Sequence, residues 1–258
     1  MEDGAAERLR DAIQGAVDEA LSSGTANVAF SGGLDSGIIA AMSKGRAKLY
    51  TVGTEGAYDV TASAELASIM GTEWEHIPLT DGGIGDSLTE MMRITGTVNP
   101  ITLSFEIPMF YILKYSTEDV VLSGQGADEL FAGYAKYVNL RHDELRDRMK
   151  EDMIRLTGET MDHERKMAEH FGKRIAYPYM DERVTSLVGS MEIKDIAPGD
   201  VRKSVLRDVA VLIGRPEIAA KPKKAAQYGS GTMDMIRSLA KRNGMTVSQL
   251  ITKIAEGL

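Results

Sequence analysis

Apolar residues along the chain form either short continuous runs or stripes at helical spacing. Leu9, Ile13, Val17 and Leu21 form one such stripe and predict an amphipathic helix over residues 3–23. Short apolar runs then predict strands at 26–30, 47–53, 73–79 and 119–122. The segments that follow predict helices at about 36–44, 60–70, 86–96 and 108–115. This alternation predicts an α/β fold in which a parallel sheet carries helices on its faces.

The second half of the chain has a different pattern. After Ala127 strand signals are absent, and the spacing predicts helices at about 127–134, 138–170, 180–190, 200–213, 233–243 and 246–257. Thr246 and Gln249 have the spacing of a capping box for the last of these. We therefore expect one domain over 1–258, with an α/β part over about 1–135 and a helical part over about 136–258.

Composition excludes several classes of function. The formal net charge of −8 argues against broad nucleic-acid binding, which needs a basic face. Cysteine is absent, which excludes disulfides, thiolate metal sites and a cysteine nucleophile. No apolar run approaches the roughly 20 residues of a membrane span, and the acidic N-terminus has no signal-peptide pattern. We expect a cytoplasmic protein that does not enter a membrane.

The stretch after the first strand carries candidate chemistry. Residues 28–42 read VAFSGGLDSGIIAAM, with Ser31, Gly32, Gly33, Asp35 and Ser36 between a strand and a helix. Glycine N–H groups and a helix N-terminus form an anion cradle. A carboxylate in such a cradle repels a phosphate unless a cation lies between them, so Asp35 suggests Mg²⁺. The alternative is an ordinary strand-turn-helix junction capped by one of these side chains.

Three stretches together resemble a known family. The first is similar to the SGGxDS signature of the PP-loop ATP pyrophosphatases. Residues 120–134, VVLSGQGADELFAGY, resemble the SGEGADELFGGY segment of the asparagine synthetase C-terminal domain and of β-lactam synthetase. Residues 221–231, KPKKAAQYGSG, lie where that family has a lysine before a glycine-containing loop, although a solvated basic loop is an alternative. Weaker matches keep the same order over nearly the whole chain.

This resemblance implies a PP-loop fold, ATP and Mg²⁺ as cofactors, and a role for each matching residue. Asp35 and Asp128 would hold Mg²⁺, and Lys223 would neutralise charge on the phosphates and on the acyl intermediate. Lys203 and Arg207 are further phosphate candidates, unless they are two cations on a solvated helix face. The pyrophosphate would contact Ser31, Gly32, Gly33 and Ser36. The adenosine pocket would be lined by Ala29, Val52, Gly53, Ser123 and Gly124.

The chain departs from the family where the second substrate would bind. The family has Glu or Tyr between the glycines of the second motif, and both can transfer protons. Here the residue is Gln125, an amide that cannot act as a base. Where the family has RASTPMY, residues 104–110 read SFEIPMF, so Glu106 is a candidate for the missing carboxylate. The alternative for Glu106 is a cap or an ion pair on a helix surface.

The implied reaction is ATP-dependent amide synthesis through an acyl adenylate, with AMP and pyrophosphate as products. By resemblance the default carboxylate substrate is aspartate. The family's glutaminase domain has a cysteine nucleophile, which this sequence lacks, so nitrogen would come from ammonia, a separate glutaminase or another amine. Two alternatives stay open: another PP-loop adenylating enzyme, such as one that modifies tRNA, and a non-catalytic nucleotide-binding module.

Overall fold

A computed structural model of the chain describes residues 4–197, 201–221 and 229–258. Its centre is a five-stranded sheet in the order β3-β2-β1-β4-β5, and all neighbouring strands are parallel. The strands are β1 (Ala26–Ala29), β2 (Ala47–Gly53), β3 (Trp74–Pro78), β4 (Val120–Leu122) and β5 (Arg174–Ala176). The predicted α/β class with a parallel sheet is confirmed, and the architecture is of the PP-loop type.

Both faces of the sheet are buried. Successive strand residues point to opposite faces, and Val28 and Leu49 belong to one apolar cluster. Tyr50 and Val52 belong to a second cluster. Because helices cover both faces, the central strands read as nearly continuous apolar runs, which is why the sequence located them.

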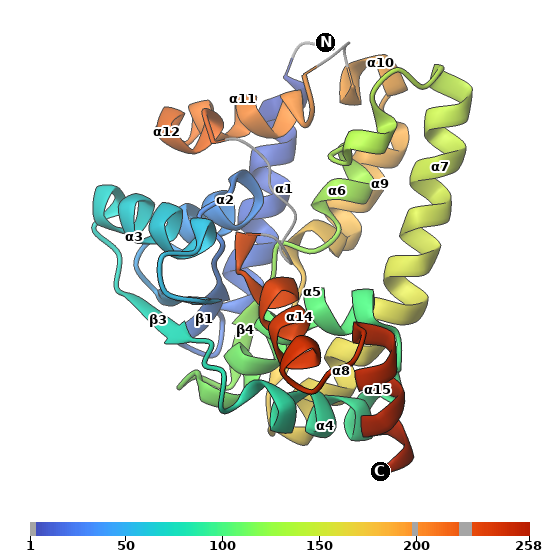
Figure 1. Cartoon of the computed structure of the whole chain (residues 1–258). Coiled ribbons are helices and arrows are strands. Elements are labelled where there is room, and N and C mark those ends of the chain that lie inside the picture. Colours follow the sequence, from blue (N-terminus) through green and yellow to red (C-terminus); the bar gives the residue numbers. More distant parts are fainter. Residues whose placement is uncertain (1–3, 198–200, 222–228) are drawn as a thin grey trace.

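Most helices contribute buried residues to one of these two apolar clusters. The first cluster includes residues of α1 (Ala5–Ala20), α2 (Leu34–Met42), α3 (Tyr58–Met70), α9 (Glu182–Ser190), α11 (Ser204–Leu212) and α12 (Pro216–Ala219). The second includes residues of α4 (Ile84–Thr95), α5 (Pro100–Tyr115), α8 (Met161–His170), α14 (Thr232–Arg242) and α15 (Val247–Glu256). Figure 1 shows α11 and α12 beside α2, with α4, α8 and α15 grouped at the other end of the molecule.

The remaining helices also contribute buried residues to the first cluster. They are α6 (Ala127–Leu130), α7 (His142–Arg155), α10 (Ile193–Ile196), and short 3-10 helices at Ala135–Tyr137 and Pro178–Met180. A single π-helical turn, Leu156–Thr160, joins α7 to α8. Such turns often occur at functional sites, and this one borders the cavity described below.

The expectation of no strand after Ala127 was wrong. β5 pairs with β4 at the sheet edge, where Ile175 lies opposite Val121. The strand begins with Arg174 and is only partly buried, so it lacks the continuous apolar character by which β4, of the same length, was recognised. The second half of the chain therefore contributes to the sheet. The division near residue 135 stays a prediction.

Three predicted helices have different bounds in the structure. Helix α5 begins at Pro100, where Asn99 accepts hydrogen bonds from the N–H groups of Ile101 and Thr102, so Pro108 lies inside the helix instead of starting it. Helix α6 ends early because Ala132 has a positive φ of 51°. The single helix expected over 138–170 is α7, the π turn and α8.

One further local prediction is confirmed. The capping box of α15 is present, with reciprocal hydrogen bonds between Thr246 and Gln249. Within the described ranges, no helix combines the length and the apolar character that a membrane crossing would require.

Candidate active site

The two polar loops identified in the sequence follow adjacent strands. β1 pairs with β4, and the strand order reverses between them, because β2 and β3 lie on one side of β1 while β5 lies beyond β4. In open parallel sheets, ligands bind beyond the carboxyl ends of the strands at such a reversal. The loops that begin at Ser31 and Ser123 leave the sheet at this point, and both line a cavity of about 590 Å³.

The first loop is held close to helix α3. Gly32 has a φ of +68°, and a Cβ added there would lie 2.6 Å from the Ser63 nitrogen and 2.7 Å from the Ala62 carbonyl carbon. The Ser36 hydroxyl lies 3.2 Å from both the Ser31 nitrogen and the Ser31 hydroxyl. The loop thus presents backbone and hydroxyl groups at the N-terminus of α2, an arrangement suited to an anion.

We expect Gly32→Ala to lower the free energy of unfolding by about 1–3 kcal/mol. The alanine would be confined to a left-handed conformation and would press its Cβ against the backbone of α3. Gly33→Ala is the matched control, because Gly33 has a φ of −87° and its added Cβ would meet only Ser31 Oγ, at 3.4 Å. Urea unfolding measures both variants, and equal midpoints would contradict this explanation.

The second loop packs against the first. A Cβ on Gly124 would lie 3.3 Å from Asp35 Cβ and 3.3 Å from the Ser36 nitrogen. Gly126 has a φ of +90°, and its added Cβ would lie 2.5 Å from Met180 Sδ. This close approach brings the carboxylates of the two motifs to one place although they are far apart in the sequence.

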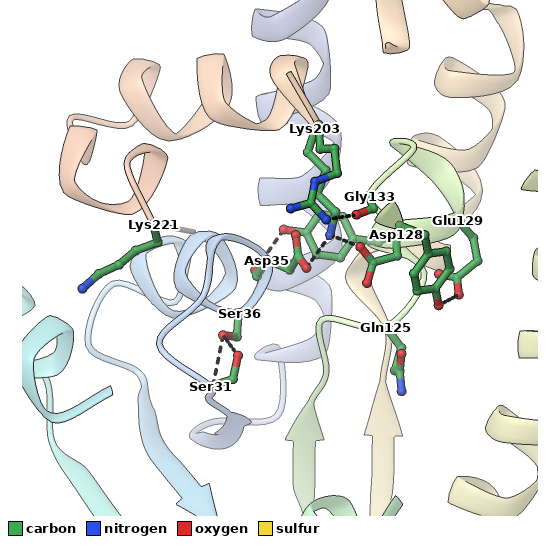
Figure 2. A network of polar contacts seen from close by, with 12 residues as sticks. Ser31, Asp35, Ser36, Gln125, Asp128, Glu129, Gly133, Lys203 and Lys221 are labelled. Atoms are coloured by element: carbon green, nitrogen blue, oxygen red, sulfur yellow. Dashed lines mark hydrogen bonds and ion pairs between the residues drawn. The ribbon is translucent and has the colours of Figure 1, made fainter. Parts of the chain in front are cut away.

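Lys203 joins these carboxylates. Its Nζ lies 2.5 Å from Asp35 Oδ2 and 2.7 Å from Asp128 Oδ1, and Figure 2 shows the ammonium between the two side chains. The lysine side chain is only 4% exposed. Burial acts to lower the pKa of Lys203, but the two carboxylates outweigh it and raise the pKa above its usual value. The ammonium is therefore charged.

The carboxylate pair fits a magnesium ion bound together with phosphate. Among residues 4–197, 201–221 and 229–258, no three His, Asp or Glu side chains gather around one point, so a site made of protein ligands alone is absent there. Mg²⁺ commonly takes one or two carboxylates and completes its shell with phosphate oxygens and water. The ammonium held by Asp35 and Asp128 shows that a cation can be accommodated between them.

Most residues expected to contact the nucleotide line this cavity. They are Ala29, Ser31, Gly32, Gly33, Asp35, Ser36, Val52, Ser123, Gly124, Asp128, Lys203 and Arg207. Gly53 is not among the lining residues: its backbone packs against Val60 and the Ser230 carbonyl. Arg207 binds backbone carbonyls, including that of Ala219. Lys223 lies outside the described residues.

A buried carboxylate lies beside Gln125. Gln125 Nε2 donates to Glu164 Oε1 at 3.3 Å, and the Tyr177 hydroxyl donates to Glu164 Oε2 at 2.8 Å. Glu164 is 1% exposed and still lines the cavity. Burial raises the pKa of Glu164 to about 7, and the hydrogen bonds from Tyr177 and Gln125 limit the rise. A carboxyl group with this pKa can accept or donate a proton near neutral pH.

Glu106 lies neither in the cavity beside Gln125 nor on a helix surface, the two positions that the sequence suggested. It is 1% exposed, so it does not cap or pair on a helix surface, and it is not among the cavity-lining residues that include Gln125. Its carboxyl oxygens lie 3.0 and 3.2 Å from His163 Nδ1. Burial, with Glu164 and Glu159 adding to it, raises the pKa of Glu106 to about 9. Burial lowers the pKa of His163, so the two form a neutral pair behind the cavity wall.

Because Glu106 is held protonated beside His163, we expect the free energy of unfolding to depend on pH. Glu106→Gln should remove this contribution to the pH dependence. Glu106 keeps its proton in the folded state up to about pH 9, whereas an unfolded glutamate loses it near 4.5. The stabilising contribution is therefore complete below about pH 4.5 and is lost progressively as the pH rises to 9, by at most about 1.4 kcal/mol per pH unit.

The measurement is urea unfolding of the wild type and of Glu106→Gln at pH 6 and pH 9. We expect the variant to lose less stability over this interval, because its amide stays neutral. Glu256→Gln, at an exposed position of the last helix, serves as control and should follow the wild type. Parallel pH dependence in all three proteins would show that Glu106 is not held protonated.

Cationic side chains also border the cavity. Lys136 and Arg155 are both lining residues, and Lys136 Nζ lies 2.6 Å from Asp152 Oδ2. Arg155 is exposed and ends α7, directly before the π turn. Arg155 can attract an anionic substrate group, whereas Asp152 offsets the charge of Lys136.

Glu164 could not be identified from sequence spacing. It lies in the segment MDHERKMAEH, where charged residues are typical of a solvated helix face. Its burial depends on how α8 packs against α5 and β5, which local spacing does not encode. The departure at Gln125 was the available clue, because it indicated that a carboxylate had to come from another element.

Comparisons with known proteins agree with the resemblance seen in the motifs. The sequence profile of the family described as Asparagine synthase matches residues 8–149 and 137–256. The chain is 28% identical to the putative asparagine synthetase [glutamine-hydrolyzing] 1 of Methanocaldococcus jannaschii, over 85% of this chain and 48% of that protein. It is 27% identical to the asparagine synthetase [glutamine-hydrolyzing] of Rattus norvegicus, over 77% of this chain and 38% of that protein.

A third relative matches a shorter region. The asparagine synthetase domain-containing protein 1 of Mus musculus is 29% identical over 49% of this chain and 22% of that protein. The chain thus spans about half the length, or less, of these relatives. The profile match extends over almost the entire sequence. The chain belongs to the asparagine synthase family.

Proposed function

We propose that this protein joins a carboxylic acid to an amine at the expense of ATP, through an acyl adenylate. In the first step a substrate carboxylate oxygen attacks the α-phosphorus, the bond to the bridging oxygen breaks and pyrophosphate leaves. In the second step the amine nitrogen attacks the acyl carbon, the bond to AMP breaks and the nitrogen gives up a proton. Family membership supports amide ligation. The cavity supports a reaction in two steps, because it is lined by groups suited to adenylation and by a carboxylate suited to aminolysis.

The end of the cavity at β1 is suited to the triphosphate. Ser31, Ser36 and the N-terminus of α2 would bind phosphate oxygens through hydroxyl and N–H donors. Asp35 and Asp128 would hold Mg²⁺, which would offset charge on the leaving pyrophosphate. Lys203, which is charged and buried beside these carboxylates, would contribute a second positive charge by turning to the phosphates.

The other end of the cavity is suited to the acceptor reaction. Glu164 would take the proton from the attacking amine, a role that Gln125 cannot fill because an amide has no ionisable group in this range. Gln125 and Tyr177 would orient the carboxylate through their hydrogen bonds. Arg155, which lines the cavity, would attract a carboxylate of the substrate. Aspartate remains the default acid, by family resemblance.

One observation carries the proposal. A single cavity joins two carboxylates bridged by a cation, at the loops after β1 and β4, to a buried glutamate that titrates near neutral pH. Adenylation needs the first feature and aminolysis needs the second. A module that only binds nucleotide requires no titrating carboxylate at the far end.

The test is a screen for pyrophosphate release by the purified chain with Mg²⁺, ATP and a panel of carboxylic acids. We expect one acid, with ammonium or another amine, to give AMP, pyrophosphate and an amide. Glutamine alone should yield no glutamate, because the sequence contains no cysteine that could attack it. Glutamate formed from glutamine by this chain alone would contradict the proposed nitrogen source. Pyrophosphate release that requires bulk tRNA would favour tRNA modification instead.

A further inference from the structure

Lys203 is held in an unusual position. It precedes α11 with a φ of +57°, a left-handed backbone conformation that residues other than glycine rarely adopt. A Cβ on Gly133 would lie 2.1 Å from Lys203 Cε and 1.9 Å from Asp128 Oδ1, so the surrounding backbone fits closely around this contact. Residues strained in this way tend to occur at switch points and ligand sites.

The ammonium and a metal ion cannot occupy this place together. Lys203 Nζ lies 2.5 Å from one carboxylate and 2.7 Å from the other, and Mg²⁺ would bind the same oxygens at about 2.0–2.1 Å. Two cations in one buried space would repel each other strongly. Without any cation, the two carboxylates would repel each other instead. The site therefore holds one cation at a time between Asp35 and Asp128.

We propose that Lys203 is a built-in substitute for the metal and makes metal binding depend on nucleotide. Before ATP binds, its ammonium keeps Asp35 and Asp128 together and excludes divalent ions. When ATP enters, the phosphates give the flexible lysine stem a new anionic partner beside the Ser31 loop, and the metal takes its place. The site accordingly binds metal and nucleotide as a unit. This inference rests on the proposed function, because it takes Asp35 and Asp128 as the metal ligands.

The test uses Mn²⁺ alone as probe, with the full chain and no nucleotide. Free Mn²⁺ is counted by electron paramagnetic resonance. We expect Lys203→Met to bind one Mn²⁺ at least tenfold more tightly than the wild type, because the carboxylates lose their internal cation. Lys203→Arg keeps the positive charge and should exclude Mn²⁺ as the wild type does. Lys221→Met is the matched control, since Lys221 also lines the cavity but pairs with Glu65.

A second measurement covers the stability of the variant. Lys203→Met should melt at a lower temperature than the wild type in EDTA and recover by several degrees in Mn²⁺, whereas the wild type should respond little. The double variant Lys203→Met, Asp128→Asn should lose the tighter binding. If Lys203→Met and the wild type bind Mn²⁺ equally and melt alike with and without it, the inference is overturned.

The two proposals can fail separately. If the wild type releases pyrophosphate from Mg²⁺ and ATP while Lys203→Met gains no Mn²⁺ affinity, the exchange of cations is wrong and the proposed function stands. If Lys203→Met gains affinity while no acid supports pyrophosphate release, the carboxylate pair is a metal site and the proposed reaction is wrong.

Discussion

Glu164→Gln is expected to slow amide formation by about 10²–10⁴-fold while exchange of pyrophosphate with ATP continues. This range is typical for the loss of a positioned general base. Glutamine keeps the size of the side chain and can still bond to Tyr177, but it cannot accept the proton of the attacking amine. Because the pKa of Glu164 is raised to about 7, amide formation in the wild type should increase as the pH rises through 7. The variant should lack this increase.

The measurement compares the pyrophosphate exchange rate with the amide formation rate in each protein. Glu169→Gln is the matched control, because Glu169 lies on the same helix but is exposed and paired with Arg165. Tyr177→Phe removes a hydrogen bond that lowers the pKa of Glu164, so its pH profile should move to higher pH. Equal losses of both rates in Glu164→Gln would indicate a structural role for Glu164.

Asp35→Asn and Asp128→Asn are each expected to reduce pyrophosphate release by at least about 10²–10³-fold. That is the usual cost of removing one well-placed electrostatic group from a transition state. Each substitution conserves shape but removes one of the two charges available to hold the metal. Asp147→Asn, at an exposed position of α7, should behave as the wild type.

Circular dichroism should show that both variants keep the fold, so that the loss is one of chemistry. Wild-type turnover in either variant would mean that Mg²⁺ is held elsewhere. A loss of fold in both would show that Asp35 and Asp128 are needed to bind Lys203 structurally.

The sequence predicted the nucleotide end of the cavity better than the acceptor end. Ser31–Ser36 and Ser123–Asp128 are continuous stretches that follow buried strands, and parallel strands place their carboxyl ends at one edge of the sheet. Local pattern and chain direction were therefore enough to bring Asp35 near Asp128. The contact of both with Lys203 also depends on the turn before α11, where a positive φ at a lysine has no sequence signal.

The acceptor end is formed by elements whose packing is not local. Glu164 reaches Gln125 only because α8 packs between α5 and β5, and β5 itself has too little apolar character to be recognised. Glu106 was selected because it replaces a family residue, yet the turn of α5 directs it toward His163. Helical spacing identified which residues share a face, but it did not show which face meets the cavity.

The most direct test of the central claim follows oxygen from the acid to the nucleotide. The acid found in the screen is labelled with ¹⁸O in its carboxylate and incubated with ATP, Mg²⁺ and ammonium, and the AMP is analysed by mass spectrometry. An acyl adenylate requires one ¹⁸O atom to appear in AMP, with pyrophosphate as the other product. Formation of ADP and phosphate, or amide formation with unlabelled AMP, would contradict the account.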